Sequence, residues 1–187
     1  MNTISGEVTK VSENSKINRV CDRAIVGITE GNPDALSVIY DSIGRQIYFA
    51  AYSLLKNHED AEDVLQNVLI EIVNSAASYR RGSSARAWIL AIAKNQALKY
   101  MRDSKSTIPL DDLENDDGHA AGDDGLLSSL TMFDALKTLS DEEQTLILLH
   151  IESGFKFHEI AELLNITKAS AEKKYQRALK KLKAYYE

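Results

Sequence analysis

Apolar residues recur at spacings of three and four along most of the chain, which is the repeat of one face of an α-helix. In the first part of the chain this pattern predicts helices over about 20–31, 33–50, 59–74 and 84–102. Residues 1–18 are polar and lack such a repeat, so we expect them to form a loose arm.

Local signals set the expected starts of these helices. Asn32 suits an N-cap and Pro33 suits the first helical position, so a helix should begin there. Glu59 and Asp60 place negative charge in the first turn of the next helix, where the helix dipole favours it. The segment 75–84 that follows is predicted to be a loop.

The rest of the chain is predicted to be helical after a break. Residues 104–128 are rich in Asp, Gly, Ser and Asn, which is typical of a linker. Helices are then predicted over about 130–139, 141–152, 157–164 and 168–186.

Two of these later helices carry start signals. Ser140, with Glu143 three residues on, forms the signature of a capping box. Thr167 can cap the last helix, and Gly154 ends the helix that begins after Ser140.

Composition supports an all-α fold. Two prolines and nine glycines are few for the turns of a β-sandwich. The single cysteine, Cys21, excludes an intramolecular disulfide. The start of the chain lacks a signal-peptide core, and no apolar run approaches the roughly 18 residues of a membrane span. We therefore expect a cytoplasmic protein without membrane insertion.

Charge is segregated along the chain, although the formal net charge is −6. Residues 108–130 hold seven acids and no Lys or Arg. Residues 79–107 hold seven bases against one acid, and residues 165–187 hold seven bases against two acids. Two basic segments of this kind permit binding to nucleic acid, which the net charge alone would argue against.

Signatures of catalysis are missing from the sequence. There is no glycine-rich phosphate loop and no G-x-S-x-G elbow. The four histidines and the cysteine lack the spacing of metal ligands, and the acids at 111–124 lack the pattern of a calcium-binding loop. We therefore expect no catalytic residues, no metal site, no cofactor and no enzymatic activity.

The last two predicted helices have the form of a helix-turn-helix. A short amphipathic helix over 157–164 is followed by a three-residue turn, Asn165-Ile166-Thr167, and by a Lys-rich helix. In this motif the second helix enters the major groove of DNA. An ordinary helical hairpin with a solvated basic face remains the alternative interpretation of these residues.

Three stretches resemble one protein family when taken together. Asp60–Gln66 reads D-A-E-D-V-L-Q and Ala87–Asn95 reads A-W-I-L-A-I-A-K-N, and both resemble region 2 of RNA polymerase sigma factors. Leu139–Leu182 resembles sigma region 4, with its landmarks at Glu159–Leu164 and Arg177–Leu182. The order of the stretches, with only a linker between the regions, resembles the extracytoplasmic-function (ECF) subfamily.

The resemblance implies an all-α fold of two small helical domains, a region 2 helical bundle and a region 4 helix-turn-helix, joined by an acidic flexible linker. We expect an N-terminal arm over 1–18, region 2 over 19–106, the linker over 107–129 and region 4 over 130–187. It also implies a factor that directs core RNA polymerase to promoter DNA and initiates transcription, with an anti-sigma factor as a further candidate partner.

The resemblance also implies the site residues. The residues that would bind polymerase are Glu62, Asp63, Gln66 and Asn67. Those that would melt and bind the −10 promoter element are Tyr79, Arg80, Arg81, Ser83, Ser84, Arg86, Lys94, Asn95, Lys99 and Arg102. Those that would read the −35 element are Lys168, Ser170, Glu172, Lys173, Gln176 and Arg177.

Some positions depart from the family pattern. Asn165 stands where Gly is common, and Asn tolerates the left-handed conformation that the turn requires. Ala169 and Ala171 replace a common Gly and Val, and Glu172 stands where a cation is frequent. The −35 sequence therefore stays open, as does the choice between a nucleic-acid mimic and a solubilising tether for the acidic linker.

Two other classes of protein are alternatives to a sigma factor. A polymerase-independent helix-turn-helix transcriptional regulator would account for 130–187 but would leave the D-A-E-D and Trp segments without a role. A helical protein-interaction module would have a partner that covers the basic faces.

Overall fold

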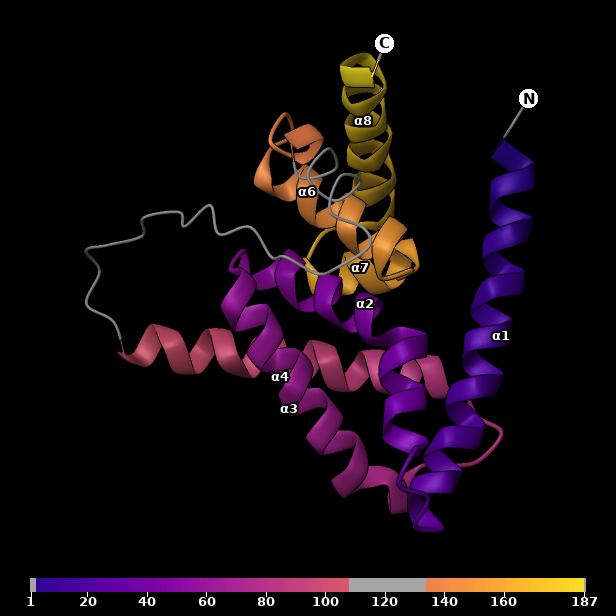
Figure 1. Ribbon diagram of the computed structural model, residues 1–187. Coiled ribbons are helices and arrows are strands. Elements are labelled where there is room, and N and C mark those ends of the chain that lie inside the picture. Colours follow the sequence, from indigo (N-terminus) through magenta and orange to yellow (C-terminus); the bar gives the residue numbers. More distant parts are fainter. Residues whose placement is uncertain (1–2, 108–133, 187) are drawn as a thin grey trace.

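The computed structural model describes the backbone of residues 3–107 and 134–186, and the side chains of residues 14–103 and 134–186. Every regular element within these residues is helical, as expected (Figure 1). The linker predicted over 107–129 lies outside the described residues apart from Thr107, which ends a helix.

The helices form two units along the chain. The N-terminal unit holds α1 (Thr3–Thr29), α2 (Ala35–Leu55), α3 (His58–Ser75), the 3₁₀ turn η1 (Ala76–Ser78) and α4 (Ala85–Thr107). The C-terminal unit, residues 134–186, holds α6 (Asp141–Ile147), the π-helical turn η2 (Leu148–Glu152), α7 (Phe157–Leu163) and α8 (Lys168–Tyr186).

The first helix corrects the expectation of a loose N-terminal arm. Residues 3–18 are helical and continue without a break into the segment where a helix was predicted. The downstream half is anchored because Cys21 and Ile25 are fully buried. No proline occurs before Pro33, so a helix fixed by this packing can extend towards the N-terminus.

The start of α2 also differs from the prediction. Asp34 is its N-cap and the helix begins at Ala35, two residues after the predicted start. The Asn32 side chain instead accepts a hydrogen bond from the Asp34 N–H at 3.0 Å. Asn32 therefore stabilises the preceding turn, and Pro33 lies within that turn.

Three further helix starts lie close to their predicted places and have capping contacts, whereas the start predicted near residue 130 lies outside the described residues. Asn57 accepts a hydrogen bond from the Asp60 N–H at the start of α3. Ser140 and Glu143 form a complete capping box at the start of α6. Thr167 accepts from the Ser170 N–H at 3.1 Å at the start of α8, and Asn165 has the expected positive φ of 51°.

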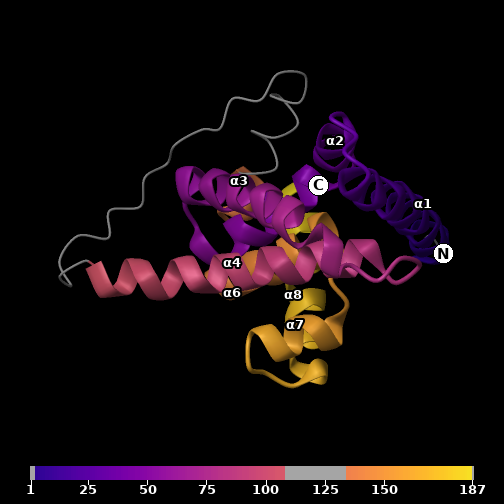
Figure 2. The same cartoon turned by 90° about the horizontal axis from the view of Figure 1, so that it is seen from below.

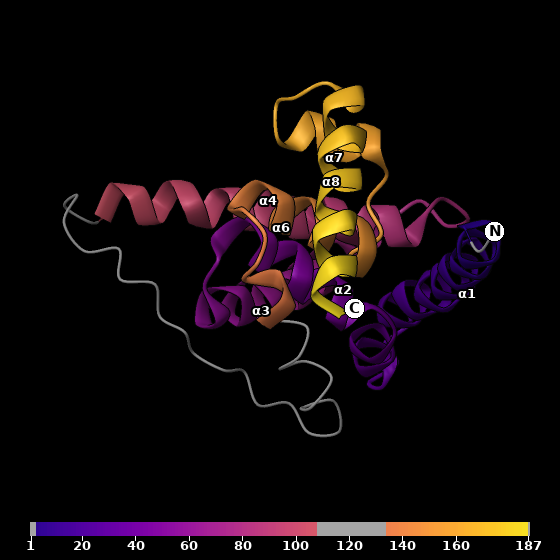
Figure 3. The ribbon, with the colours of Figure 1, turned by 90° about the horizontal axis from the view of Figure 1, so that it is seen from above.

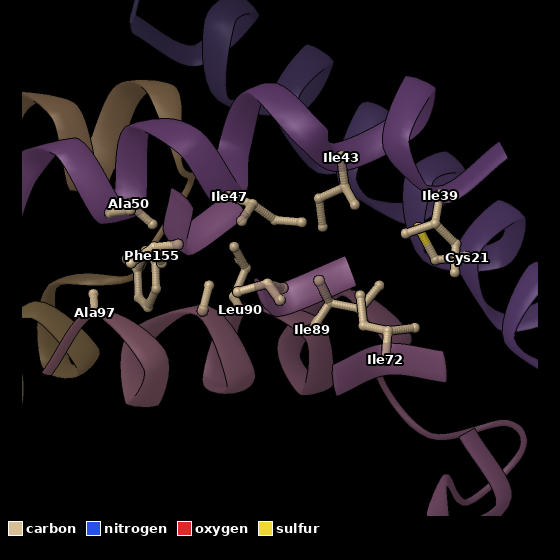
Figure 4. Close-up of a cluster of buried hydrophobic side chains, with 14 of the residues drawn as sticks. Cys21, Ile39, Ile43, Ile47, Ala50, Ile72, Ile89, Leu90, Ala97 and Phe155 are labelled. Atoms are coloured by element: carbon tan, nitrogen blue, oxygen red, sulfur yellow. The ribbon is translucent and has the colours of Figure 1, made fainter. Parts of the chain in front are cut away.

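The main core lies where α1, α2, α3 and α4 meet (Figure 4). Ile39, Ile43 and Ile47 lie along one face of α2 and are almost completely buried. They meet Ile72 of α3 and Ile89 of α4 in the same cluster. Apolar burial of this kind is the main stabilising contribution to a helical bundle.

The two units share this core instead of standing apart. Leu146, Leu149, Phe155 and Ile160 of the C-terminal unit belong to the same buried cluster as α2 and α4. Figure 4 shows Phe155 between Ala50 of α2 and Ala97 of α4. We call this contact between the two units the interdomain seam.

A second apolar cluster extends the seam. Phe49 of α2 packs with residues of the C-terminal unit, namely Leu136, Leu139, Ile147, Leu148 and Ala178. η2 and α6 lie against α2, whereas α8 packs mainly on α6 and α7 and rises away from α2 in Figure 1. The predicted pair of helical domains is therefore present, and the two domains are packed together.

Polar contacts border the apolar part of the seam. Arg45 of α2 forms an ion pair with Glu152 at 3.0 Å. The buried Thr145 hydroxyl lies 3.0 Å from the carbonyl oxygen of Ser53. Lys56, which ends α2 with a left-handed φ of 57°, directs its ammonium group to the Asp141 carbonyl oxygen at 3.5 Å.

We predict that Phe155→Ala weakens the seam. Phe155 is only 7% exposed, and removing a buried phenyl ring leaves a cavity that costs about 3 kcal/mol or more. Urea unfolding should show the loss of stability, and small-angle scattering should show a larger radius of gyration. Phe155→Leu is the control, because it keeps much of the volume and should lose less. Unchanged stability and radius in Phe155→Ala would contradict the role of the ring.

We also predict that Lys56 makes stability rise with pH. Burial lowers the pKa of Lys56 to about 8 from an ordinary 10.5, so above pH 8 the unfolded chain binds more protons than the folded chain. Stability then rises with pH. Burial raises the pKa of Cys21 from 9.0 to about 11, which opposes this trend above pH 9. Denaturation between pH 8 and 9 should show the rise in the wild type and a flatter profile in Lys56→Met. Equal slopes in both proteins would contradict the prediction.

Candidate nucleic-acid interface

The four residues predicted to bind polymerase lie on one face of α3. Glu62, Asp63, Gln66 and Asn67 are all exposed. The opposite face carries the buried stripe of Ala61, Val64, Val68 and Ile72, which packs into the core. Residues three and four apart share a face of a helix, so the buried stripe itself fixes the direction of the exposed set.

This face of α3 continues into apolar residues that the sequence interpretation missed. Ile70 is 58% exposed and Val73 is 43% exposed. They follow Gln66 at spacings of four and three, on the face opposite to the buried stripe. Their positions out of phase with that stripe are the signal that identifies them. Exposed apolar residues beside polar ones are typical of a protein-binding surface.

The loop between η1 and α4 forms a tight turn. The Ser83 N–H donates to the Arg80 carbonyl oxygen at 3.0 Å, and Gly82 has a φ of +78° that favours glycine. Arg80, Arg81 and Ser83 are exposed. The turn therefore presents two guanidinium groups and a hydroxyl to solvent.

Tyr79 is more enclosed than a residue expected to bind DNA directly. Its ring packs against Trp88 with centroids 5.2 Å apart, and its hydroxyl donates to Asp22 at 2.7 Å. Burial and the bond to Asp22 raise the pKa of Tyr79. Trp88 in turn packs against the main core.

Arg86 is held by the protein on several sides. Its Nε donates to Gln46 at 3.0 Å, and its Nη2 donates to the Ser153 carbonyl oxygen across the interdomain seam. Burial lowers the pKa of Arg86. A Cβ added at Gly154, whose φ is +68°, would lie 2.3 Å from Nη2. In this structure the guanidinium group predicted to contact DNA is a link between the units.

The exposed side of α4 carries the remaining residues predicted for the −10 element. Asn95, Lys99 and Arg102 are exposed at spacings of four and three, so they share a face. Lys94 is half-buried beside them. Figure 2 shows α4 running across the view, with α3 on one side of it and α7 on the other. These residues of α4, with Arg80 and Arg81 of the loop before it, form one stretch of polar and basic side chains.

The α7–α8 pair has the geometry of a helix-turn-helix. Ile160 and Ala161 of α7 are buried, and Ile166 of the turn packs against the core. Ala171 and Ala178 fix the buried face of α8. Figures 2 and 3 show the corner between α7 and α8 projecting away from α1 to α4.

The predicted recognition residues lie mostly in the open on α8. Lys168, Lys173, Gln176 and Arg177 are exposed, whereas Ser170 and Glu172 are half-buried. The Glu172 carboxylate pairs with Lys168 at 3.5 Å on the same helix. The acid that departs from the family pattern thus has a partner within α8.

Some basic residues of α8 form ion pairs with α6. Lys174 forms an ion pair with Glu142, and Lys181 forms one with Glu143 at 2.7 Å. The bond to Lys181 is the main cause of the lowered pKa of Glu143. These two lysines are seven residues apart, so they lie on the same side of α8, which faces α6. That spacing is the sequence signal for their pairing with acids of α6.

Within the described parts of the chain, no group of three or more His, Cys, Asp or Glu side chains is arranged to hold a metal ion. None of the helices described is both long and apolar enough to span a membrane.

Comparison with known families gives two matches. Sigma-70 region 2 matches residues 39–107, and Sigma-70, region 4 matches residues 130–182. The matched stretches contain the α3 face, the loop before α4 and the helix-turn-helix. They also have the order that the sequence motifs predicted.

Relatives and a solved structure agree with these matches. The ECF RNA polymerase sigma factor SigX of Bacillus subtilis (strain 168) is 23% identical, with 82% of this chain and 84% of the relative covered. The RNA polymerase sigma factor SigV of the same strain is 26% identical, covering 73% of this chain and 81% of the relative.

Among solved structures, CnrH in complex with the cytosolic domain of CnrY has a similar fold, with a TM-score of 0.54 and 19% identity. The match covers 89% of this chain and 97% of that one. With both sigma regions present in order, the chain belongs to the extracytoplasmic-function subfamily of RNA polymerase sigma factors, which bind core polymerase and direct it to promoters.

Proposed function

We propose that this sigma factor binds core polymerase through the exposed face of α3 and contacts promoter DNA through α4, the loop before it, and α8. The separation of these faces from the buried stripes of the same helices is the observation that carries the proposal. The factor contributes recognition and melting, and the chemistry of RNA synthesis belongs to the polymerase.

The proposed polymerase-binding face combines charge with apolar surface. Glu62, Asp63, Gln66 and Asn67 supply acids and amides that can pair with donors on a partner. Ile70 and Val73 extend the face and add apolar area that a partner would bury. An interface of this kind gains its orientation from the polar residues and much of its affinity from the apolar ones.

The proposed −10 surface melts DNA by supporting flipped bases and the strand that carries them. Unstacking a base costs a few kcal/mol, and protein contacts to the released strand must offset this cost. Arg80, Arg81 and Ser83 in the loop, with Asn95, Lys99 and Arg102 on α4, supply cations and hydrogen-bonding groups in the open. Tyr79, Ser84 and Arg86 support the loop and the start of α4.

The proposed −35 surface is the exposed side of α8. A bidentate contact of Gln176 with adenine or of Arg177 with guanine would give about 1–3 kcal/mol of discrimination. Glu172 can exchange its partner Lys168 for a cytosine amino group, which would leave Lys168 free for phosphate. Whether Glu172 stays paired with Lys168 or binds cytosine therefore affects which promoter sequence α8 reads.

The proposed domain division follows the family pattern, with region 2 before the linker and region 4 after it. The proposed −10 surface lies on the N-terminal unit and the proposed −35 surface lies on the C-terminal unit, so different units read the two elements. We propose that the interdomain seam opens when both elements are bound, while the chain continues to join the two units.

A protein partner besides polymerase fits the same picture. The similar structure of CnrH was solved in complex with the cytosolic domain of CnrY. We propose that an anti-sigma factor likewise binds this chain, and that the chain acts in the cytoplasm, where polymerase is found. A polymerase-independent regulator is not favoured, because it would give the exposed face of α3 no partner.

We predict that Asp63→Arg combined with Gln66→Ala lowers the affinity for core polymerase by about tenfold or more. The change reverses a charge and removes an amide at the centre of the proposed face, and like-charge contacts are costly at interfaces. Fluorescence anisotropy measures the association, and promoter-specific transcription should fall in parallel. Asp41→Arg, at an exposed position on α2, is the charge-matched control. Wild-type association of the double variant, with its circular dichroism unchanged, would show that another face binds polymerase.

We predict that Lys99→Ala weakens promoter binding by the holoenzyme at all promoters alike. A lysine that neutralises one phosphate contributes about 0.7–0.9 to the log–log dependence of affinity on salt. Titrations at several salt concentrations should show this slope reduced by that amount, with sequence preference unchanged. Lys137→Ala, at an exposed site where the ammonium group pairs with Asp134, is the control. A slope equal to that of the wild type would exclude a phosphate contact at Lys99.

A further inference from the structure

The first helix carries two polar residues that face the promoter loop. Asn18 and Asp22 are four residues apart on α1 and therefore lie on the same side of the helix. The neighbouring positions Cys21 and Ile25 are fully buried against α2 and α4. Packing of α1 on the core thus aims both polar side chains at residues 79–86.

Asp22 joins the two ends of the tight turn. One oxygen of its carboxylate, Oδ1, accepts from the Tyr79 hydroxyl at 2.7 Å and from the Gly82 N–H at 2.8 Å. These two bonds lower the pKa of Asp22, so the carboxylate stays ionised at neutral pH. Hydrogen bonds to a charged acceptor are stronger than bonds between neutral groups.

Asn18 supports the start of α4 from outside that helix. Its Oδ1 accepts from the Arg86 N–H at 3.1 Å and lies 3.3 Å from the Ser84 hydroxyl oxygen. The first N–H groups of a helix have no partner within it. Ser84 accepts from the Ala87 N–H through its own side chain, and Asn18 accepts from the Arg86 N–H.

The contacts leave the DNA-facing groups of the loop unoccupied. Asp22 uses its Oδ1 on a hydroxyl and a backbone N–H, whereas Arg80 and Arg81 are exposed. Within the described residues neither arginine forms an ion pair. The shape of the turn is thereby fixed while both guanidinium groups stay exposed, although Arg81 is near enough to Asp22 to contribute to the lowered pKa of that carboxyl group.

We propose that Asp22, assisted by Asn18, is a positioning residue for promoter melting. It holds the 79–86 loop in its binding shape before DNA arrives, so that binding does not have to order the loop. The inference rests on the proposed role of this loop at the −10 element. It adds α1 to the melting machinery, although α1 lies before the part of the chain that matches region 2.

The test compares promoter melting with polymerase binding. Holoenzyme containing Asp22→Ala is mixed with promoter DNA that carries 2-aminopurine in the −10 element, and fluorescence reports the rate of opening. We expect opening to slow by about tenfold, because two bonds to a charged group are lost. Affinity for core polymerase should match that of the wild type. Asp41→Asn, an exposed acid on α2, is the control and should open promoters normally.

Companion variants separate positioning from folding. Asp22→Asn keeps an acceptor oxygen and should restore part of the rate. Tyr79→Phe removes the hydroxyl but keeps the ring against Trp88, and Asp22→Ala should cost less in that background because the two share a bond. Asn18→Ala keeps both Asp22 contacts and should slow opening to a smaller degree.

Three results would overturn the inference. Wild-type opening by Asp22→Ala would show that the loop needs no support from α1. An equal loss of opening, polymerase affinity and melting temperature in Asp22→Ala would show a purely structural role. Unchanged opening in Arg80→Ala with Arg81→Ala would show that the loop itself does not melt promoters, and the proposed function of the loop would then fall first.

Discussion

The burial of α2 on more than one side is the constraint on which the rest of the structure depends. Ile39, Ile43 and Ile47 face the helices of the N-terminal unit, while Phe49 packs against the C-terminal unit. A helix that is apolar on several faces is stable only when helices surround it. The main core and the interdomain seam therefore arise from one segment of sequence, and each other helix is oriented by how it packs against α2 or its neighbours.

This packing explains how an acidic protein can present basic surfaces. Each peripheral helix uses its apolar stripe for the core, and its opposite side is left for contact with other molecules. On α3 that side is acidic and partly apolar, whereas on α4 and α8 it is basic. Part of the positive charge is used internally, since Lys174 and Lys181 pair with acids of α6. Net charge is a poor guide to binding when the fold distributes charge in this way.

Local signals allowed much of the fold and part of the site to be predicted from sequence. The starts at Ser140 and Thr167 depend on hydrogen bonds that span three residues, so their signatures are visible in the sequence. The exposed residues of α3 follow from the period of its buried stripe. Contacts between distant segments left no such trace. The enclosure of Arg86 depends on Gln46 and Ser153, and the fixing of Tyr79 depends on Asp22, 57 residues earlier.

The glycine at the seam has a consequence for the evolution of this factor. Gly154 combines a backbone conformation that disfavours side chains with a close approach to the Arg86 guanidinium group. A side chain at position 154 would both strain the backbone and displace Arg86. Loss of the Arg86 contact would weaken the interdomain seam. A genetic selection for strains in which the two units of the factor separate more readily should therefore recover changes at position 154. Among related proteins, the identities of the residues at positions 86 and 154 should change together.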